Sequence, residues 1–200
     1  MEKYRTYLLI GSPGSGKGTQ GKALGTLPGF FHCACGDVFR SIDTSTPLGQ
    51  AFLHYSSKGQ LVPDDITVKL WLARIAACVE SHAFRPNVDR LILDGIPRNV
   101  EQERIMEDIL EIEQVFHLDC PDRKRLIERL KKRALRDNRL DDANEEVIHR
   151  RLEVYRMESE PLLSCYPKAR RREIDALAQP HHVMLQILNA IAETEKAAAT

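Results

Sequence analysis

The sequence has no excess of either charge, and this absence limits its partners. Lysine and arginine together number 29, and aspartate and glutamate together also number 29. A balanced chain has no overall field that attracts nucleic acid or an anionic membrane surface. We therefore expect neither as a partner, and any anion site has to be built locally from a few cations.

Long hydrophobic runs and paired cysteine spacings are also absent. The apolar run Tyr7 to Ile10 is far too short for a membrane-spanning helix, and no signal peptide is recognisable, so a cytoplasmic protein is expected. The five cysteines are odd in number and show no spacing typical of a disulfide framework or a zinc site. This pattern favours reduced, mostly buried thiols.

Short apolar segments alternate with stretches of helical periodicity. Strands are predicted over 7–10, 30–33, 90–93 and 115–118, with a weaker one over 172–174. Helices are predicted over 17–27, 48–57, 64–80, 99–111, 121–135, 145–163 and 180–194. This alternation predicts a three-layer α/β fold in one domain spanning residues 1–200.

Two segments interrupt the alternation. The first is a predicted helical insertion from Gly36 to Val62, and the second is the charged segment from Ala134 to Glu146, which is expected to be a turn-rich loop. Both should lie at the carboxyl ends of the strands, where open α/β sheets bind their ligands.

A glycine-rich segment follows the first predicted strand. Gly11 to Gln20 reads GSPGSGKGTQ, which matches the phosphate-loop pattern G-x-x-x-x-G-K-[S/T] except that Gly18 stands in the last position. Glycines allow several backbone N–H groups to point at one anion, and the following helix adds the positive end of its dipole. Lys17 is then placed to reach the β and γ phosphates of a nucleotide.

A carboxylate follows the strand at residues 90–93. Asp94 would lie beside the glycine loop, where it could hold a water of a magnesium ion; capping of the segment that follows is the alternative. Arg98, four residues later, is expected at the ligand edge of the sheet.

Arginine is abundant near the predicted ligand-edge loops, whereas spare carboxylates are few there. For Arg129 and Lys132, a solvated helix face is an equally good interpretation. Transfer of a phosphoryl group to an alcohol needs a base, but transfer to a phosphate needs fixed cations. The arginines favour a phosphate acceptor, and they stand at positions 40, 98, 133, 139 and 151.

Five motifs in order make the chain, from Gly11 to about Val183, resemble the nucleoside monophosphate kinases and, among them, the adenylate kinases. They are GSPGSGKGTQ, CGDVFR, GQLVPDD, LDGIPRNVEQ and RLDDANEEVIHRRLEVY. The resemblance implies a three-layer P-loop kinase fold with a parallel five-stranded sheet. It also implies a monophosphate-binding insertion (34–62), a short lid without structural metal (132–142) and a core (1–33, 63–131 and 143–200).

The resemblance implies reversible transfer of the γ-phosphoryl group of ATP to AMP, which gives two molecules of ADP. Mg²⁺ would arrive with ATP and be held mainly by phosphates and waters, with Asp94 behind those waters, so no residue is a direct metal ligand. Glycine after the loop lysine is usual in this family, and the expected enzyme is a monomer. Pro97 matches a proline whose peptide bond is commonly cis.

The same resemblance carries roles to individual residues. Those expected to act in phosphoryl transfer are Lys17, Arg98, Arg133, Arg139 and Arg151. Those expected to bind ATP are Gly14, Ser15, Gly16, Lys17, Gly18, Thr19, Arg129, Arg133 and Gln179. Those expected to bind AMP are Cys35, Gly36, Arg40, Gln60, Leu61, Val62, Gly95, Arg98, Gln102, Arg139 and Arg151.

Two departures bear on the acceptor base. Cys35 stands where adenylate kinases usually have threonine, and Ile96 replaces a usual phenylalanine, so a UMP or CMP kinase remains an alternative. Gln102 resembles the glutamine that reads adenine, which favours AMP. The longer loop DDANEE leaves Arg150 as an alternative to Arg151.

Two more distant alternatives remain. One is a non-catalytic ATP-binding sensor, against which the two sets of phosphate-binding arginines speak. The other is a small-metabolite kinase with Asp37 as base, although a helix N-cap explains Asp37 more simply.

Overall fold

A parallel sheet forms the centre of the molecule. The computed structural model describes residues 3–137, 139, 142 and 144–198, and these include one five-stranded sheet with the strand order β2-β3-β1-β4-β5. All neighbouring strands pair in parallel. The predicted P-loop kinase fold is confirmed in this sheet, whose strands are β1 (Tyr4–Ile10), β2 (Phe30–Ala34), β3 (Arg90–Asp94), β4 (Leu110–Asp119) and β5 (Arg171–Asp175).

The central strands are buried on both faces, which is why their sequences read as unbroken apolar runs. In β1, Tyr7 and Leu9 join one hydrophobic cluster, while Leu8 and Ile10 join the other. Each of these side chains is at most 4% exposed. Alternate residues of a strand point to opposite faces, so two helical layers have to cover this sheet.

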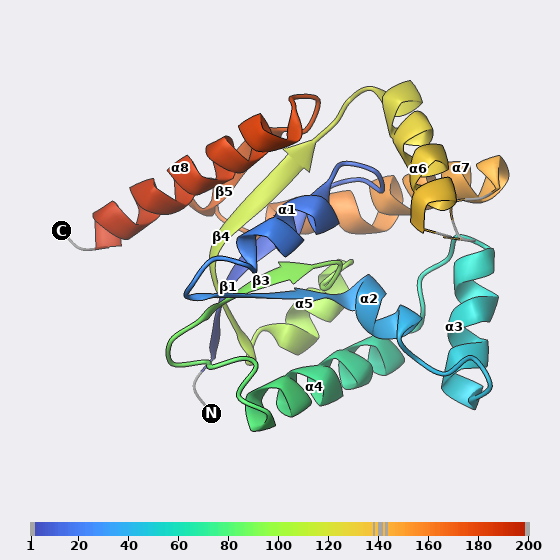
Figure 1. Cartoon of the computed structure of the whole chain (residues 1–200), viewed down its shortest axis with the longest axis horizontal. Coiled ribbons are helices and arrows are strands. Elements are labelled where there is room, and N and C mark those ends of the chain that lie inside the picture. The colour runs from blue at the N-terminus through green and yellow to red at the C-terminus, as the bar shows by residue number, and fades with distance from the viewer. Residues whose placement is uncertain (1–2, 138, 140–141, 143, 199–200) are drawn as a thin grey trace.

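Helices supply the two outer layers (Figure 1). One cluster combines the sheet with α1 (Lys17–Leu24), α6 (Arg123–Asp137), α7 (Glu145–Val154) and α8 (Pro180–Ala198). The other contains Trp71 and Ile75 of α4 (Asp64–Glu80) and Met106 of α5 (Val100–Met106). In Figure 1, α8 lies above the sheet and α4 below it.

The insertion after β2 is helical, as predicted, and consists of α2 (Cys35–Arg40) and α3 (Pro47–Ser57). Thr46 caps α3 by accepting a hydrogen bond from Gly49 N. Beyond α3, Gly59 packs so closely on α7 that a β-carbon there would lie 3.0 Å from the carbonyl oxygen of Val147 and 3.1 Å from Cγ of Arg151. The insertion therefore contacts the helix that follows the expected lid.

Several predicted boundaries were wrong. The helix predicted over 99–111 ends at Met106, because β4 begins at Leu110. The helix predicted over 145–163 ends as α-helix at Val154 and continues as a π turn (Tyr155–Ser159) and a 3-10 turn (Glu160–Cys165). The loop expected from Ala134 is helical through Asp137, and the rest of that expectation rests partly on residues 138, 140, 141 and 143, which lie outside the described residues.

Three smaller observations complete the fold. The Ile96–Pro97 bond is cis, as the resemblance implied. All five cysteines are free, and four of them are buried. Within the described ranges, no helix is both long and apolar enough to cross a membrane.

Candidate active site

A cavity of about 600 Å³ opens beside the carboxyl ends of β1 and β3. Its wall is formed by the glycine loop, by α2, by residues that follow α3, and by side chains from α6 and α7. Sequence segments far apart in the chain therefore meet in one place. With the exception of Gln179, every residue for which a binding or catalytic role is expected lines this cavity, and so does Asp94.

The glycine loop has the backbone shape that its sequence predicted. Gly14 has φ 86° and Gly16 has φ 103°, which are left-handed conformations that favour glycine. Gly14 also packs on α6, since a β-carbon there would lie 3.1 Å from the carbonyl oxygen of Leu126. The loop is thus fixed against the helix that carries Arg129 and Arg133.

Polar groups of the loop are arranged for an anion. Nζ of Lys17 donates to the carbonyl oxygens of Gly11 at 2.6 Å and Ser12 at 3.2 Å. Oγ of Ser15 is buried and has no hydrogen-bond partner among the described residues. Buried polar atoms are usually paired, so an unpaired hydroxyl beside a lysine suits a phosphate oxygen.

The local field lowers the basicity of the loop lysine. Burial, which Asp94 opposes and Arg98, Arg133 and Arg151 reinforce, is the largest of the influences that together lower the pKa of Lys17 from 10.5 to about 8. The ammonium of Lys17 therefore lies in a site with more positive than negative neighbours. A polyanionic ligand would relieve this repulsion.

Asp94 faces the glycine loop at the point where the motif departs from its usual form. A β-carbon at Gly18 would lie 3.5 Å from Oδ2 of Asp94. The capping alternative for Asp94 was wrong, because Asn99 is the N-cap of α5 and accepts a hydrogen bond from Gln102 N. The carboxylate is thus placed at the cavity rather than used to begin a helix.

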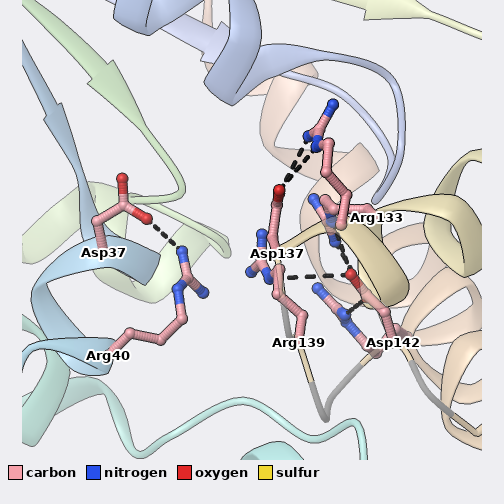
Figure 2. Close-up of polar contacts among 8 residues, drawn as sticks. Asp37, Arg40, Arg133, Asp137, Arg139 and Asp142 are labelled. Carbon is pink, nitrogen blue, oxygen red and sulfur yellow. Dashed lines mark hydrogen bonds and ion pairs between the residues drawn. The ribbon is translucent and has the colours of Figure 1, made fainter.

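The buried carboxylate of Asp142 contacts three arginines, one from α6, one from the segment after α6 and one from α7 (Figure 2). The side chain of Asp142 is 0% exposed. Its Oδ2 accepts from Nε of Arg133 at 2.6 Å and its Oδ1 accepts from Nη2 of Arg133 at 3.0 Å. Oδ1 also accepts from Nη1 of Arg151, and Nε of Arg139 forms an ion pair with Oδ2 at 3.8 Å. We call these four residues the Asp142 cluster.

An ion pair between Arg40 and Asp37 lies apart from the Asp142 cluster in Figure 2. Nη2 of Arg40 donates to Oδ1 of Asp37 at 2.5 Å, and Lys22 forms an ion pair with Oδ2 of Asp37 at 3.5 Å. These cations hold the pKa of Asp37 below its usual value, although its partial burial acts in the opposite direction. Asp37 lies inside the first turn of α2, whose N-cap is Ala34, so the expected N-cap role of Asp37 was wrong.

Comparison with known proteins agrees with this geometry. Residues 9–171 match the family model described as adenylate kinase. The adenylate kinase of Thermobifida fusca (strain YX) is 36% identical over 191 residues, which cover 92% of this chain and 96% of the relative. An adenylate kinase of Thermus thermophilus is 32% identical over 198 residues, with 96% of this chain and 99% of the relative covered.

The chain belongs to the adenylate kinase family. Its enzyme class is therefore that of the nucleotide phosphotransferases. Membership of the adenylate kinase family agrees with the parallel sheet and with the glycine loop that lines the cavity.

Cys35 and Ile96, the two residues that depart from the usual adenylate kinase sequence, lie in different surroundings. Cys35 lines the cavity, and burial raises the pKa of its thiol to about 11, so this position offers a neutral thiol. Ile96 is 0% exposed and packs in the hydrophobic core. Only the first departure therefore reaches the surface of the cavity.

The structure places three further residues for which an ATP or AMP contact is expected. Arg151 lines the cavity, whereas Arg150 is exposed on α7, so the geometry favours Arg151. Arg129 lines the cavity and donates from Nη1 to the carbonyl oxygen of Ala176 at 2.8 Å. Gln179 is exposed, and its carbonyl oxygen accepts from the backbone N–H groups of His182 and Val183 at the start of α8.

The sequence interpretation missed the ion pairs between carboxylates and arginines near the site. It noted Asp142 only as part of a turn, and it expected few spare carboxylates near the arginines. Asp37, Asp137 and Asp142 nevertheless pair with arginines near the cavity (Figure 2). A carboxylate flanked by arginines on both sides of a loop is the signal that could have indicated Asp142.

Proposed function

We propose that this adenylate kinase family member catalyses the reversible, magnesium-dependent transfer of the γ-phosphoryl group of ATP to AMP, giving two molecules of ADP. The observation that carries the proposal is the arrangement of cations around one cavity. Lys17 lies in the loop, Arg40 and Arg98 come from α2 and the segment after β3, and the Asp142 cluster contributes the rest. Two bound polyanions require cations on both sides.

ATP occupies the glycine loop in this proposal. Backbone N–H groups of Gly14 to Thr19 and the ammonium of Lys17 bind its phosphates, because the loop precedes a helix N-terminus and presents the buried hydroxyl of Ser15 and a cation there. Arg129 packs against the adenine, Arg133 contacts the phosphates, and the backbone near Gln179 contacts the adenine edge.

AMP occupies the side of the cavity formed by the insertion. Arg40 and Arg98 bind its phosphate, and Gln102 reads its base. The remaining contacts are assigned to Cys35, Gly36, Gln60, Leu61, Val62 and Gly95, all of which line the cavity. Because the acceptor phosphate is already anionic, the reaction needs no protein base.

Arg139 and Arg151 lie over the transferring group in this proposal. Arginine stays protonated and presents several donors in one plane, which suits the equatorial oxygens of a phosphoryl group in transfer. Both residues belong to the Asp142 cluster and line the cavity. Their charge would offset the negative charge that builds up between donor and acceptor.

The residues present suit a magnesium ion that arrives with ATP. Asp94 is a hard oxygen donor beside Gly18 of the loop, and Mg²⁺ usually keeps several waters while it binds one or two carboxylates and substrate phosphates. Asp94 would hold a water of the ion. When bound, Mg²⁺ would neutralise phosphate charge and orient the phosphates.

The division of the chain is part of the proposal. We assign residues 34–62 to the monophosphate-binding insertion, 132–142 to the lid and the rest to the core; positions 138, 140 and 141 of the lid lie outside the described residues. Closure of insertion and lid would exclude water, which could otherwise accept the phosphoryl group. One cavity collects the expected residues of a single chain, which supports a monomer; the cytoplasmic location stays a prediction.

A UMP or CMP kinase is the second candidate, because Cys35 departs from the usual threonine at the cavity. Initial rates of ADP formation from ATP and Mg²⁺ with AMP, CMP, UMP, GMP and dTMP test both. Preference for AMP supports the proposal, and preference for a pyrimidine supports the alternative. No turnover with any acceptor would contradict both and favour a sensor.

Substitution of Arg98 tests the assignment of the two nucleotides. Arg98→Ala removes a charged donor and should weaken AMP binding about ten- to hundredfold while ATP affinity stays nearly unchanged. Arg104→Ala is the matched control, because this arginine of α5 has a side chain that is 72% exposed and forms an ion pair with nearby Glu101. Equal loss of affinity for both nucleotides would contradict the assignment.

A further inference from the structure

The side chain of Gln102 lies in a hydrogen-bond network behind the wall of the cavity. Gln102 lines the cavity and is 1% exposed. Its Oε1 accepts from the backbone N–H of Arg98 at 2.8 Å, and its Nε2 donates to Oδ1 of Asp64 at 2.7 Å. Both polar atoms of the carboxamide are therefore already engaged by fixed partners.

A neighbouring asparagine strengthens the network. Nδ2 of Asn99 donates to Oδ1 and Oδ2 of Asp64 at 3.1 and 3.2 Å, while Oδ1 of Asn99 accepts from the backbone N–H of Gln102 at 2.8 Å. Because Oδ1 of Asn99 caps α5, this side chain cannot turn over without losing the cap. Asp64 is thus held by two amide groups and in turn holds Gln102.

The network fixes which way the carboxamide of Gln102 faces. The backbone N–H of Arg98 can only donate, and the carboxylate of Asp64 can only accept. A rotated carboxamide would place its NH₂ group against the N–H of Arg98 and its oxygen against the carboxylate. Two hydrogen bonds would be replaced by two repulsive contacts, so one orientation is strongly preferred.

Each polar atom of the Gln102 carboxamide can form one more hydrogen bond. Nε2 has a second N–H, and Oε1 has a second lone pair, since the described contacts use one of each. The cavity-facing edge of Gln102 therefore presents a donor beside an acceptor in a fixed order. Adenine presents the complement, an acceptor at N1 and an amino donor at N6, whereas hypoxanthine presents N1–H and O6 in the reverse sense.

We propose that Asp64 is a positioning residue that fixes the polarity of the Gln102 carboxamide and thereby selects a monophosphate with adenine-type hydrogen bonding. This inference rests on the proposed function, which places the monophosphate base at Gln102. Asp64 is not among the residues that line the cavity, so it acts through Gln102 and has no contact with the ligand. Cytosine has the same order of groups as adenine, so this device alone rejects hypoxanthine, guanine and uracil.

A role of Asp64 in stabilising the start of α4 has to be separated from its role in positioning Gln102. Asp64 begins α4, where any carboxylate favours the positive end of the helix dipole. Asp65 lies in the same first turn and is exposed, and the hydrogen bonds of Gln102 among the described residues go to Arg98, Asn99 and Asp64 instead. Asp65→Ala therefore removes the same charge from the same helix end and is the matched control.

The test compares the dissociation constants of AMP and IMP, measured by calorimetry on the whole protein in the absence of ATP. IMP differs from AMP in the group at C6 and the proton at N1. The ratio of the two constants, measured on one sample, does not depend on the fraction of folded protein. The wild type should bind AMP more tightly, and Asp64→Ala should reduce this preference about tenfold, which is within the range for one bidentate contact.

Two further variants complete the test. Asp65→Ala should keep the wild-type ratio. Asp64→Asn keeps one acceptor oxygen but no charge, so it should recover most of the preference. The inference is overturned if Asp64→Ala and Asp65→Ala have the same ratio, if Asp64→Asn behaves like Asp64→Ala, or if the wild type does not prefer AMP.

Turnover assays distinguish this inference from the proposed function. A wild type that forms ADP from ATP and AMP, but whose AMP preference does not depend on Asp64, would retain the function and overturn the inference. A protein whose binding preference depends on Asp64 but which has no turnover would support the inference and contradict the catalytic function.

Discussion

The ammonium of Lys17 should make the ligand-free protein less stable than a variant without this charge. Lys17 lies in the glycine loop, is only partly exposed and has a pKa lowered from 10.5 to about 8, first by burial and then by Arg98, Arg133 and Arg151. Folding therefore transfers a charge into a site that disfavours it. Lys17→Met removes the charge and keeps a flexible side chain of similar length.

The size of this destabilisation follows from the pKa values of Lys17 in the unfolded and the folded chain. One pH unit of difference corresponds to about 1.4 kcal/mol, so a change from 10.5 to about 8 corresponds to about 3.4 kcal/mol below about pH 7. The side chain keeps some contact with solvent, which screens the charge, so we expect about half of this value. The loss of the hydrogen bonds from Lys17 to Gly11 and Ser12 acts against this gain in the variant.

The pH dependence of the free energy of unfolding separates the cost of the buried charge from the loss of the Lys17 hydrogen bonds. Below about pH 8 both the folded and the unfolded chain carry the proton on Lys17, and the folded state bears the full cost. Between about pH 8 and pH 10.5 the unfolded state binds one more proton than the folded state, so the free energy of unfolding of the wild type rises with pH. The Met variant lacks this contribution, whereas all other titrations are common to both proteins.

Urea unfolding at about pH 7 and about pH 9.5 measures this difference. The single tryptophan, Trp71, is 0% exposed and reports unfolding by fluorescence. The free energy of unfolding of the wild type should rise relative to that of Lys17→Met by about 1 to 2 kcal/mol across this range. A difference between the two proteins that stays constant with pH would refute the reasoning.

Three other substitutions have expected outcomes. Asp142→Ala should lower the free energy of unfolding by about 3 kcal/mol, because the arginines of the Asp142 cluster lose a buried carboxylate; added pyrophosphate should raise the melting temperature of this variant more than that of the wild type. Gly49→Ala should destabilise the insertion by about 1 to 3 kcal/mol, since its β-carbon would lie 2.3 Å from the carbonyl oxygen of Asp43, and limited proteolysis should then cut 34–62 faster. Cys35→Thr should lower the dissociation constant of AMP several-fold, because a hydroxyl replaces a neutral thiol at the cavity. This change corresponds to about 1 kcal/mol of binding free energy.

The strands could be predicted because the sheet is buried on both faces. Apolar runs such as Leu91 to Leu93 have one explanation when a glycine loop and helical segments surround them. The first half of β4 could not be found this way. It carries Glu111, Glu113 and Gln114 and forms a strand because it pairs with the start of β1, and such pairing leaves no local pattern.

The cavity could be predicted, but the contacts that orient its side chains could not. Glycine spacing and arginine positions indicated which residues would meet, since the carboxyl ends of parallel strands share one edge. The partners of those residues come from distant segments. Asp64 meets Gln102 across 38 positions of sequence, and a carboxylate at the start of a helix indicates by itself only a favourable charge at the helix N-terminus.

The carboxylates among the arginines explain how a site with so many cations can exist before its substrates bind. Asp142 is fully buried, and a buried carboxylate is tolerated only while cations and donors surround it. The two hydrogen bonds from Arg133 to Asp142 use two of the five N–H groups of that guanidinium. The other donors of Arg133 remain for phosphate oxygens, so substrate binding does not require Asp142 to leave. Under the proposed function the carboxylate therefore holds the guanidinium in place from one side, and the cost of orienting Arg133 is met during folding rather than during phosphoryl transfer.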